Sequence, residues 1–524
     1  LLLAFGLSVF FRAYRISGVP AEMVSDHAEK LLDVIDVLNG QNSIFFPRNT
    51  GREALQFYMA VATYKLFGTG ISHLTLKIGT VAAGILTLPF IYLLGKEVAD
   101  RKTGLFAMIL AGIAYWPNVI SRVGLRFPLY PLFVAPAMYY LVRGIRRRSL
   151  NDFLLMGFFA GAGLHGYSPA RVIPILMTVG VLLYLLHRDA KGQRLQVLSY
   201  LVAAGLVALV VLTPLARVAI DRPDELIYRM ATRMGTTEQP LPGSALMIFL
   251  QNVWDGLKMF AWDNGEVWVI GIPGRPALDW VSGALFHLGV AIAIVRYIRK
   301  RRWADVFMLV SIPLLQLPST LSLAFPGENP ATNRAAGAIV PVFFLGGLSL
   351  SALVDWMRSE WRSRAATVYA AVIVSLLIFI SARINYNLVF KQYDELFRRS
   401  AWNTSEAGQV IRGFARSVGS YENAYVVAYP HWMDTRLVGM NAGKPAKDYA
   451  IQPDQFSLLE EKSGNQLLLL NPDDSESLSR LQAMFPYGQL LEWTNPLPGK
   501  NFKIFFIPSS LVPASAAAPE FDPQ

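Results

Sequence analysis

Long apolar runs separated by short polar segments dominate the chain up to about residue 385. A membrane-spanning helix needs about 20 predominantly apolar residues. About eleven runs of roughly this length can be marked, so the pattern predicts a polytopic α-helical membrane protein. The predicted spans lie near residues 1–14, 74–95, 103–120, 124–142, 152–167, 169–187, 195–217, 278–297, 303–324, 335–355 and 365–385.

The pattern changes after residue 386, where short strand-like segments alternate with helical ones. Such alternation predicts a small α/β domain over 386–510, after the membrane domain of 1–385. The final segment, 511–524, is rich in Ala and Pro, and we expect it to be disordered. The predicted strands are 424–429, 465–470, 488–493 and 502–508, with helices near 404–418 and 474–484.

Two long loops interrupt the predicted spans, at 15–73 and 218–277. In the first loop, residues 28–39 place Leu and Ile on one helical face and acids on the other. Residues 53–67 form a second apolar segment that is too short to span. Both favour helices lying in the plane of the membrane interface, and 244–262 is a similar, aromatic-rich candidate in the second loop.

Lys and Arg recur in the short loops on one side of the predicted spans. The positive-inside rule places these loops, and the N-terminus, in the cytoplasm. Both long loops and the α/β domain are then extracytoplasmic, where Asn403-Thr404-Ser405 fits a glycosylation triplet. The basic positions are Lys96, Arg101 and Lys102; Arg143 and Arg146 to Arg148; Arg188, Lys191 and Arg194; Arg296 and 299–302; and Arg358, Arg362 and Arg364.

Composition agrees with a protein of the cell or plasma membrane, surrounded by lipid. Of the 524 residues, 53% are hydrophobic and 16% are charged, below the roughly 25% charged residues of soluble domains. The cytoplasmic loops account for the net charge of +11, so we expect no nucleic-acid partner. The absence of cysteine excludes disulfides and thiolate metal sites. Leu1 already lies in an apolar run, so we expect it inside the first membrane helix.

Asp26, in the segment VSDHAEK, is the first candidate for chemistry. A carboxylate just outside the first span can take a proton from a hydroxyl or bind a divalent cation. The competing interpretation is a helix cap, because an amphipathic helix follows and Glu29 stands three residues on.

Glu53, in TGREALQFY, opens the second predicted interfacial helix. An acid in a first helical turn is favourable without any catalytic role. Asp26 and Glu53 become informative together, since both open helices of one loop and we expect them to meet at one cleft. The same pair is the candidate site for a divalent metal ion.

Five arginines break the positive-inside rule, because they lie at the outer ends of predicted spans. A guanidinium near lipid is costly unless it has a partner, and it binds phosphate in a bidentate manner. Each could also reach headgroups or pair with a nearby acid. We expect at least two of them to converge on one anionic ligand, near His165 and Tyr167. The five are Arg122, Arg126, Arg171, Arg275 and Arg334.

The order of these features resembles the GT-C class of membrane glycosyltransferases over residues 1–385, most of all the branch of protein O-mannosyltransferases and lipid A aminoarabinose transferases. The resemblance rests on Asp26, Glu53, YKLFG (64–68), YLLGKEV (92–98) and SRVGLR (121–126). The chain departs from that pattern in two places. The family often has two adjacent acids at Asp26-His27, and Lys-Pro-Pro at residues 54–56, where this chain has Ala-Leu-Gln.

The resemblance implies transfer of a sugar from a polyprenyl-phosphate-linked donor to an acceptor hydroxyl on a protein, a lipid or a glycan. Asp26 would be the general base, Glu53 would orient the hydroxyl or share a cation, and the arginines would hold the lipid phosphate. A single displacement with one base implies inversion at the sugar carbon.

Two other classes of function stay open at this point. A flippase or transporter of lipid-linked sugars would need a polar path across the bilayer, but acids within the predicted spans are nearly absent. A non-catalytic membrane subunit that displays its outer domain to a partner would suit the aromatic-rich residues 244–280.

Overall fold

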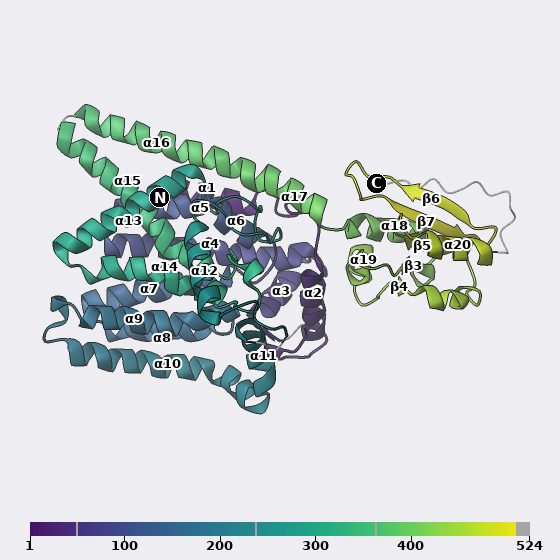
Figure 1. Ribbon diagram of the computed structural model, residues 1–524, viewed down its shortest axis with the longest axis horizontal. Coiled ribbons are helices and arrows are strands. Elements are labelled where there is room, and N and C mark those ends of the chain that lie inside the picture. Colours follow the sequence, from purple (N-terminus) through teal and green to yellow (C-terminus); the bar gives the residue numbers. More distant parts are fainter. Residues whose placement is uncertain (49–50, 236–237, 362–363, 510–524) are drawn as a thin grey trace. The chain divides into compact units, whose positions relative to one another are not determined.

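The computed structural model describes residues 1–48, 51–235, 238–361 and 364–509 (Figure 1). The chain separates into two compact units. The predicted boundary near residue 386 falls inside unit 1, and unit 2 also takes in two segments of the first outer loop. Unit 1 comprises Leu1–Pro20, Gln41–Thr63 and Leu76–Asp394, and unit 2 comprises Ala21–Gly40, Tyr64–Thr75 and the chain from Glu395 onward.

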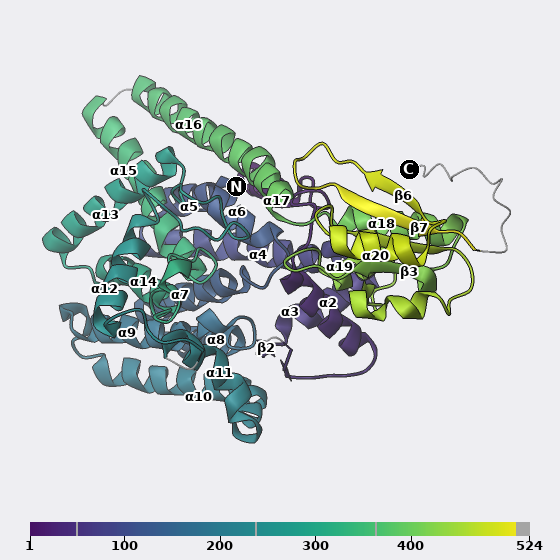
Figure 2. The same ribbon diagram turned by 45° about the vertical axis from the view of Figure 1, so that its right-hand side comes forward.

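Long helices make up most of unit 1, and each predicted span coincides with one of them or with a broken pair (Figures 1 and 2). Within the described part, these helices are α1 (Leu2–Ala13), α4 (His73–Val98), α5 (Arg101–Ile113), α6 (Tyr115–Arg122), α7 (Leu129–Arg147), α8 (Leu150–Gly163), α9 (Ile173–Leu185), α10 (Arg194–Asp221), α13 (Trp280–Lys300), α14 (Trp303–Thr320), α15 (Ile339–Trp361) and α16 (Arg364–Asn387). The chain is thus an integral membrane protein. The loop helices are α2 (Ser25–Leu38), α3 (Leu55–Phe67), α11 (Pro223–Met234) and α12 (Ala245–Lys258).

Fewer helices satisfy a strict criterion for crossing a membrane. Among the described residues, six helices are long and apolar enough, or seven if the bent pair α5–α6 is one span. Helices α1 and α8 are apolar but shorter. The total of about eleven crossings therefore stays a prediction, as does the interfacial location of α2, α3 and α12.

The break between α5 and α6 bends the chain by 54°. Breaking a helix inside a membrane protein frees backbone groups that need new partners. The Tyr115 N–H donates to Oδ1 of Asn385 at 2.7 Å, and Nδ2 of Asn385 donates to Asp279 at 2.9 Å. Asp279 also caps the start of α13. This network joins the bend to α16 and α13.

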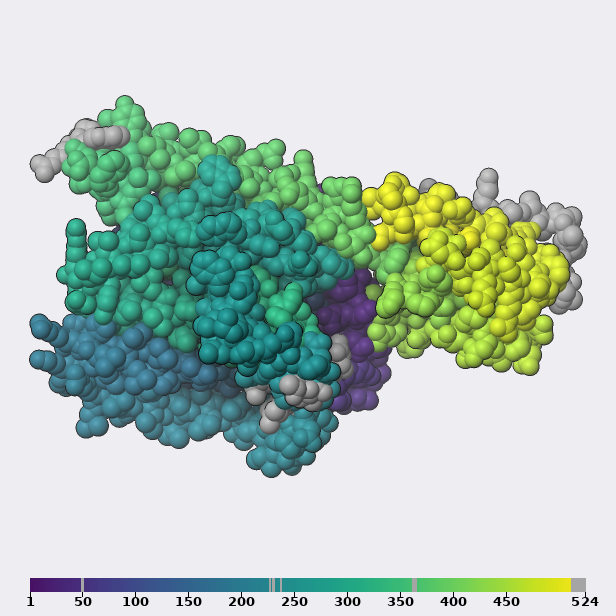
Figure 3. All heavy atoms as spheres, in the orientation of Figure 1, coloured from purple at the N-terminus to yellow at the C-terminus, as the bar shows by residue number. Residues whose placement is uncertain are grey.

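Small residues bring α8 and α10 into backbone contact. A Cβ atom at Gly157 would lie 2.2 Å from the carbonyl oxygen of Ala204, and one at Gly161 would lie 2.8 Å from that of Ala208. Such small residues four apart are typical of helix contacts in membranes. Elsewhere α10 presents exposed apolar side chains such as Leu206 and Leu209, and the helix belongs to the blue lower part of the surface in Figure 3. This surface suits lipid.

Unit 2 is built on a five-stranded sheet in the order β4-β3-β5-β7-β6. Strands β4, β3 and β5 are parallel, and β7 is antiparallel to both β5 and β6. The four predicted strands coincide with β3, β5, β6 and β7, while β4 and α19 were not predicted. The elements are β3 (Ala424–Val427), β4 (Ala450–Ile451), β5 (Gln466–Leu470), β6 (Gln489–Trp493), β7 (Phe502–Ile507), α18 (Thr404–Ser417), α19 (Thr435–Ala442) and α20 (Ser475–Met484), with α17 (Tyr393–Ser400) leading in.

Helices cover both faces of this sheet. Ile411 and Phe414 of α18 and Val438 of α19 pack on one face. Leu481 of α20 packs on the other face, together with Phe456 from the turn after β4. Alternate residues of the strands point to opposite faces, which is why residues 467–470 of β5 are all leucine. The predicted tail 511–524 lies outside the described residues.

Helix α2 belongs to unit 2 because polar side chains tie it there. Glu22 accepts hydrogen bonds from the backbone and hydroxyl of Ser405 at the start of α18. Glu29 pairs with Arg436 at the start of α19. Burial raises the pKa of Glu22. The carboxyl group that accepts these hydrogen bonds from Ser405 is therefore costly to ionise.

The predicted glycosylation triplet is internal in unit 2. Asn403 is buried, and its Nδ2 donates to Glu406 and to the carbonyl of Lys500. Thr404 is buried as well. A glycosylated asparagine needs a surface position, so this geometry favours a structural role for Asn403.

Candidate functional site

Asp26 lies in the first turn of α2 but does not cap it. The N-cap residue is Val24, whose N–H donates to Nδ1 of His27 at 2.9 Å. The Asp26 side chain is 47% exposed, and its Oδ1 lies 3.8 Å from Nζ of Lys30. Glu29, the other member of the expected capping pattern, is engaged with Arg436. The exposed Asp26 carboxylate therefore suits a role in proton transfer better than a role as a helix cap.

Glu53, in contrast, is almost completely buried, at 2% exposure, and it lies between two arginines. It ends the short strand β2 (Arg52–Glu53), which pairs with β1 (Phe45–Phe46). Its Oε2 is 2.7 Å from Nη1 of Arg126, and its Oε1 is 3.7 Å from Nη2 of Arg171. One carboxylate faces two guanidinium groups, so Glu53, Arg126 and Arg171 together carry one net positive charge.

Neighbouring contacts hold these side chains together. Gln56, at the start of α3, donates to the carbonyl of Gly124 in the loop that carries Arg126. The carbonyl of His165 accepts from the Leu55 N–H, and the His165 ring contacts the carbonyl of Val211. The ring of His165 therefore acts here as a link to α10.

Tyr167 connects this set to a second arginine set. The Arg126 guanidinium lies over its ring, 5.2 Å from the centroid, and Nδ2 of Asn333 donates to its hydroxyl at 3.3 Å. The next residue, Arg334, binds Glu328, which also binds Arg233 at 2.7 Å. Four arginines and two glutamates thus form one chain of contacts, with two positive charges in excess. We call these residues the arginine chain: Arg171, Glu53, Arg126, Tyr167, Asn333, Arg334, Glu328 and Arg233.

The charge state of Glu328 follows from this setting. Burial alone would raise the pKa of Glu328, but the nearby guanidiniums of Arg334 and Arg233 lower it below its usual value. Glu328 is therefore ionised near neutral pH, and it orients both arginines. Arg233 and Glu328 were not predicted from the sequence, although Arg233 breaks the positive-inside rule as the other five do.

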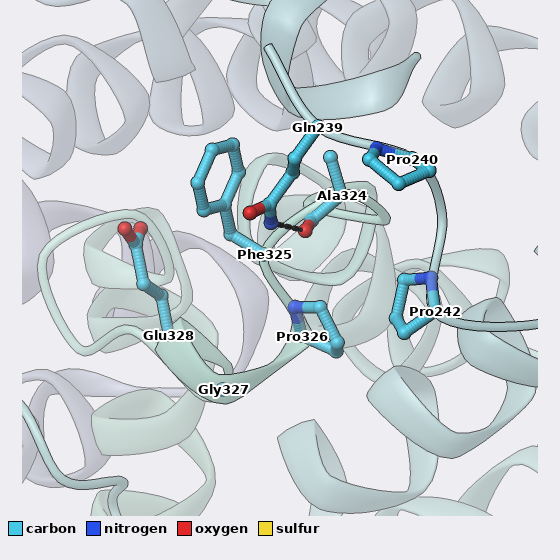
Figure 4. A pocket seen from close by; sticks show the side chains of 8 residues that line it. All are labelled: Gln239, Pro240, Pro242, Ala324, Phe325, Pro326, Gly327 and Glu328. Carbon is cyan, nitrogen blue, oxygen red and sulfur yellow. Dashed lines mark hydrogen bonds between the residues drawn. The ribbon is translucent and has the colours of Figure 1, made fainter. Parts of the chain in front are cut away.

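Glu328 also lines a pocket of about 440 Å³. The walls are mostly apolar, and Gln239 closes one side by donating to the carbonyl of Ala324 (Figure 4). An apolar hollow beside ordered charges suits a ligand with both characters. The remaining lining residues are Pro240, Pro242, Phe325, Pro326 and Gly327.

Arg122 has a different environment from Arg126, only four residues away. It is buried, and its Nη atoms donate to five backbone carbonyls at the end of α1 and in the turn beyond it. Its guanidinium also lies over the Phe390 ring. Cations near helix C-termini stabilise the unpaired carbonyls there. This geometry favours a structural role for Arg122 and gives no support to the predicted phosphate contact. The acceptors are Phe11, Arg12, Tyr14, Arg15 and Val19, at 2.7 to 3.2 Å.

Arg275 lies in the loop between α12 and α13, and its cation–π contact and its hydrogen bond are with residues outside the arginine chain. Its guanidinium lies over the Tyr115 ring, 4.9 Å from the centroid, and its Nε donates to the carbonyl of Pro276. Within the described residues its Nη atoms make no hydrogen bond. Burial lowers the pKa of Arg275. Two of its nitrogens thus remain available to an anionic ligand.

The structure therefore divides the predicted residues. Glu53, Arg126, Arg171, His165, Tyr167 and Arg334 are joined by contacts within unit 1. Asp26 belongs to unit 2. The cleft that Asp26 and Glu53 were expected to share stays a prediction.

The comparisons with known proteins agree on one class. Residues 54–216 match the family of dolichyl-phosphate-mannose-protein mannosyltransferases. The structure of ArnT from Cupriavidus metallidurans bound to undecaprenyl phosphate is 12% identical with a TM-score of 0.58, covering 99% of this chain and 98% of that one. At the level of sequence, no curated protein matches the chain.

Oligosaccharyltransferases of Archaeoglobus fulgidus are also similar. AglB in complex with an inhibitory peptide and a dolichol-phosphate is 11% identical with a TM-score of 0.53, covering 98% of this chain and 74% of that one. The enzyme tethered to an acceptor peptide is 13% identical with a TM-score of 0.52, and this chain covers only 63% of it, with 86% of its own length. At such identities these structures show a shared fold. With the family match, they confirm the predicted resemblance to the GT-C class and indicate a glycosyltransferase.

The predicted metal ligands fit a cation poorly. The two oxygens of Glu53 face Arg126 and Arg171, and a carboxylate so neutralised is a weak ligand for a divalent ion. The described residues contain no group of three or more His, Asp or Glu side chains placed to hold a metal. Zn is present in one Archaeoglobus fulgidus oligosaccharyltransferase structure, 13% identical with a TM-score of 0.53.

Proposed function

We propose that this protein transfers a sugar from a polyprenyl-phosphate-linked donor to an acceptor hydroxyl at the outer face of the membrane, with inversion at the sugar carbon. The observation that carries the proposal is the arginine chain, in which buried Glu53 orients Arg126 and Arg171. Its excess positive charge suits the phosphate of a lipid-linked sugar. The family match and the similar structures support the same class of donor.

Asp26 is the general base of this proposal. Its side chain is 47% exposed and can accept a proton from a hydroxyl, whereas Glu53 is buried and its oxygens face Arg126 and Arg171. The role of Glu53 is therefore to orient Arg126 and Arg171, in place of orienting the acceptor. The reaction requires Asp26 to reach the acceptor hydroxyl next to the anomeric carbon of the donor.

The proposed step balances as a single displacement. The acceptor O–H gives its proton to Asp26 while its oxygen bonds to the anomeric carbon. The bond from that carbon to the phosphate oxygen breaks on the opposite side, which inverts the centre. The polyprenyl phosphate leaves with one more negative charge than it carried as a diester. Preorganised guanidiniums stabilise charge that develops in this way.

Arg171 is the best placed residue of the arginine chain for direct contact with the phosphate. Its side chain is 31% exposed and lies 3.7 Å from Glu53, while Arg126 is almost fully buried. Arg334 is the next candidate, because it belongs to the arginine chain. Arg275 follows, because its Nη atoms make no hydrogen bond with the described residues. The apolar pocket beside Glu328 suits part of an apolar chain.

The first test compares Asp26→Asn with Asp36→Asn, an acid of the same helix α2. Sugar transfer from a polyprenyl-phosphate-linked donor is measured with the purified protein. We expect Asp26→Asn to lower kcat by about 10²- to 10⁴-fold, the usual contribution of a general base, and Asp36→Asn to leave it nearly unchanged. Equal activity of both variants would remove Asp26 from the mechanism.

A second test separates donor binding from the chemical step. Arg171→Ala should raise KM for the donor by about tenfold or more, because a charged hydrogen bond contributes roughly 1.5–3 kcal/mol. KM for the acceptor should not change. If neither Arg171→Ala nor Arg334→Ala changes donor dependence, the phosphate binds elsewhere.

A further inference from the structure

The connections of the unit 2 sheet define a position where chain direction reverses. From β3 the chain passes through α19 to β4 on one side, and from β5 it passes through α20 to β6 on the other. The two helices accordingly pack on opposite faces. In open α/β sheets, ligands bind outside the carboxyl ends of the strands at such a switch point. Here that point lies between β3 and β5.

The pairing register of β3 and β5 brings two loops together at the carboxyl ends of these strands. Val426 of β3 is opposite Leu469 of β5 in a parallel pair, so Ala428 and Asn471, two residues further along, leave the sheet side by side. Neighbouring strands are about 4.8 Å apart. The loop after Ala428 and the loop after Asn471 therefore form the rim of the switch point.

The first loop presents two side chains to solvent. Tyr429 and His431 are both exposed, and neither side chain makes a hydrogen bond, ion pair or ring contact within the described part of the chain. His431 also has a left-handed backbone conformation, with φ of 55°. Such a conformation in a residue other than glycine is uncommon and is concentrated at functional sites.

The second loop contributes a polar side chain that is nearly buried. Asn471 is 7% exposed, and its Oδ1 accepts from the N–H of Asp473 at 2.9 Å. Its Nδ2 makes no hydrogen bond with any described residue. This Nδ2 atom is not among the enclosed polar atoms without a partner, so it is accessible at the rim. The unused donor, together with the exposed carboxylate of Asp473, points to a ligand with hydroxyl groups.

This rim is adjacent to the helix that carries Asp26. The loop after β3 ends at Asp434, which binds Arg436. Arg436 in turn pairs with Glu29 of α2. This contact of Glu29, three residues after Asp26, joins α2 to the loop that presents Tyr429 and His431.

We propose that the β3–β5 switch point of unit 2 binds the carbohydrate part of the acceptor and presents its hydroxyl to Asp26, an inference that rests on the proposed function. Sugars are recognised by an aromatic face and by side chains that exchange hydrogen bonds with hydroxyls. Tyr429 and His431 supply rings, Asn471 supplies a donor, and Asp473 supplies an acceptor. The acceptor is therefore a glycan or a glycosylated molecule.

The test measures binding separately from transfer. The full chain in lipid nanodiscs is applied to an array of defined oligosaccharides and to Ser/Thr-containing peptides. We expect oligosaccharide binding that is about tenfold weaker in Tyr429→Ala and in His431→Ala, the loss expected for one or two good contacts. Asn471→Asp should weaken binding as well, because it keeps the Oδ1 acceptor for Asp473 and removes the Nδ2 donor.

The matched control is Tyr487→Ala, since Tyr487 is 56% exposed and lies before β6, at the opposite edge of the same sheet. It should bind oligosaccharides as the wild type does. Asp26→Asn should also retain binding, so a failure of the catalytic proposal leaves this result intact. Binding to peptides alone, no binding to any oligosaccharide, or equal losses in Tyr429→Ala and Tyr487→Ala would each overturn the inference.

Discussion

Replacing Glu53 with Gln should destabilise unit 1 because it leaves a buried guanidinium without its counter-charge. Glu53 and Arg126 are 2% and 4% exposed, and their closest atoms are 2.7 Å apart. Removing one partner of a buried ion pair costs about 3–5 kcal/mol. The contact with Arg171 is 3.7 Å long, and that side chain is 31% exposed. Solvent reduces such a pair to about 1 kcal/mol or less.

The two arginines should therefore couple to Glu53 unequally. In Glu53→Gln with Arg126→Met, both buried charges are gone, and most of the lost stability should return. In Glu53→Gln with Arg171→Met, little should return. The assay is the thermal unfolding midpoint of the purified protein in detergent, for the single and double variants in one double-mutant cycle. Equal coupling of the two arginines, or a Glu53→Gln variant as stable as wild type, would refute the reasoning.

Three further predictions concern orientation, packing and pH. Cysteines introduced at Ser149 and Ser463, in a chain without cysteine, should be labelled by an impermeant reagent on intact cells only at Ser463, and the reverse result would invert the orientation. Gly157→Leu should separate α8 from α10, because a Cβ there already meets backbone at 2.2 Å; a yield of folded protein equal to that of wild type would contradict it. Burial alone would raise the pKa of Asp434, but hydrogen bonds and charge from Arg436 lower it, so its stabilising effect should be present above about pH 3.9 and be lost as the pH falls through the lower folded pKa. Asp434→Asn should remove that acid-dependent loss in an unfolding series over pH, and an unchanged pH profile would show that Asp434 does not contribute.

The sequence was sufficient for the helices and for most of the sheet in unit 2. Apolar runs of membrane length coincide with helices because lipid requires each backbone group to be satisfied within its own segment. Strands β3, β5, β6 and β7 could be predicted because each is a short apolar run between turn residues. Strand β4 has only two residues, Ala450–Ile451, so no periodicity marks it.

The assignment of α2 to unit 2 had no signal in the local pattern. The amphipathic face of residues 28–39 fits a membrane interface and a protein surface equally well. Contacts of Glu22 with Ser405 and of Glu29 with Arg436 assign α2 to unit 2, and both join residues that are distant in the sequence.

By itself, the sequence determined which charged residues lie at positions that membrane insertion and topology do not explain. Asp26, Glu53 and the outer arginines were conspicuous because charge near lipid is costly. Only the tertiary structure decided what each of them contacts. Arg122 binds backbone carbonyls and Arg126 binds Glu53, although the two are four residues apart and of one type. The physical reason is that a guanidinium takes its role from the acceptors within its reach, and those acceptors are supplied by segments far away in the chain.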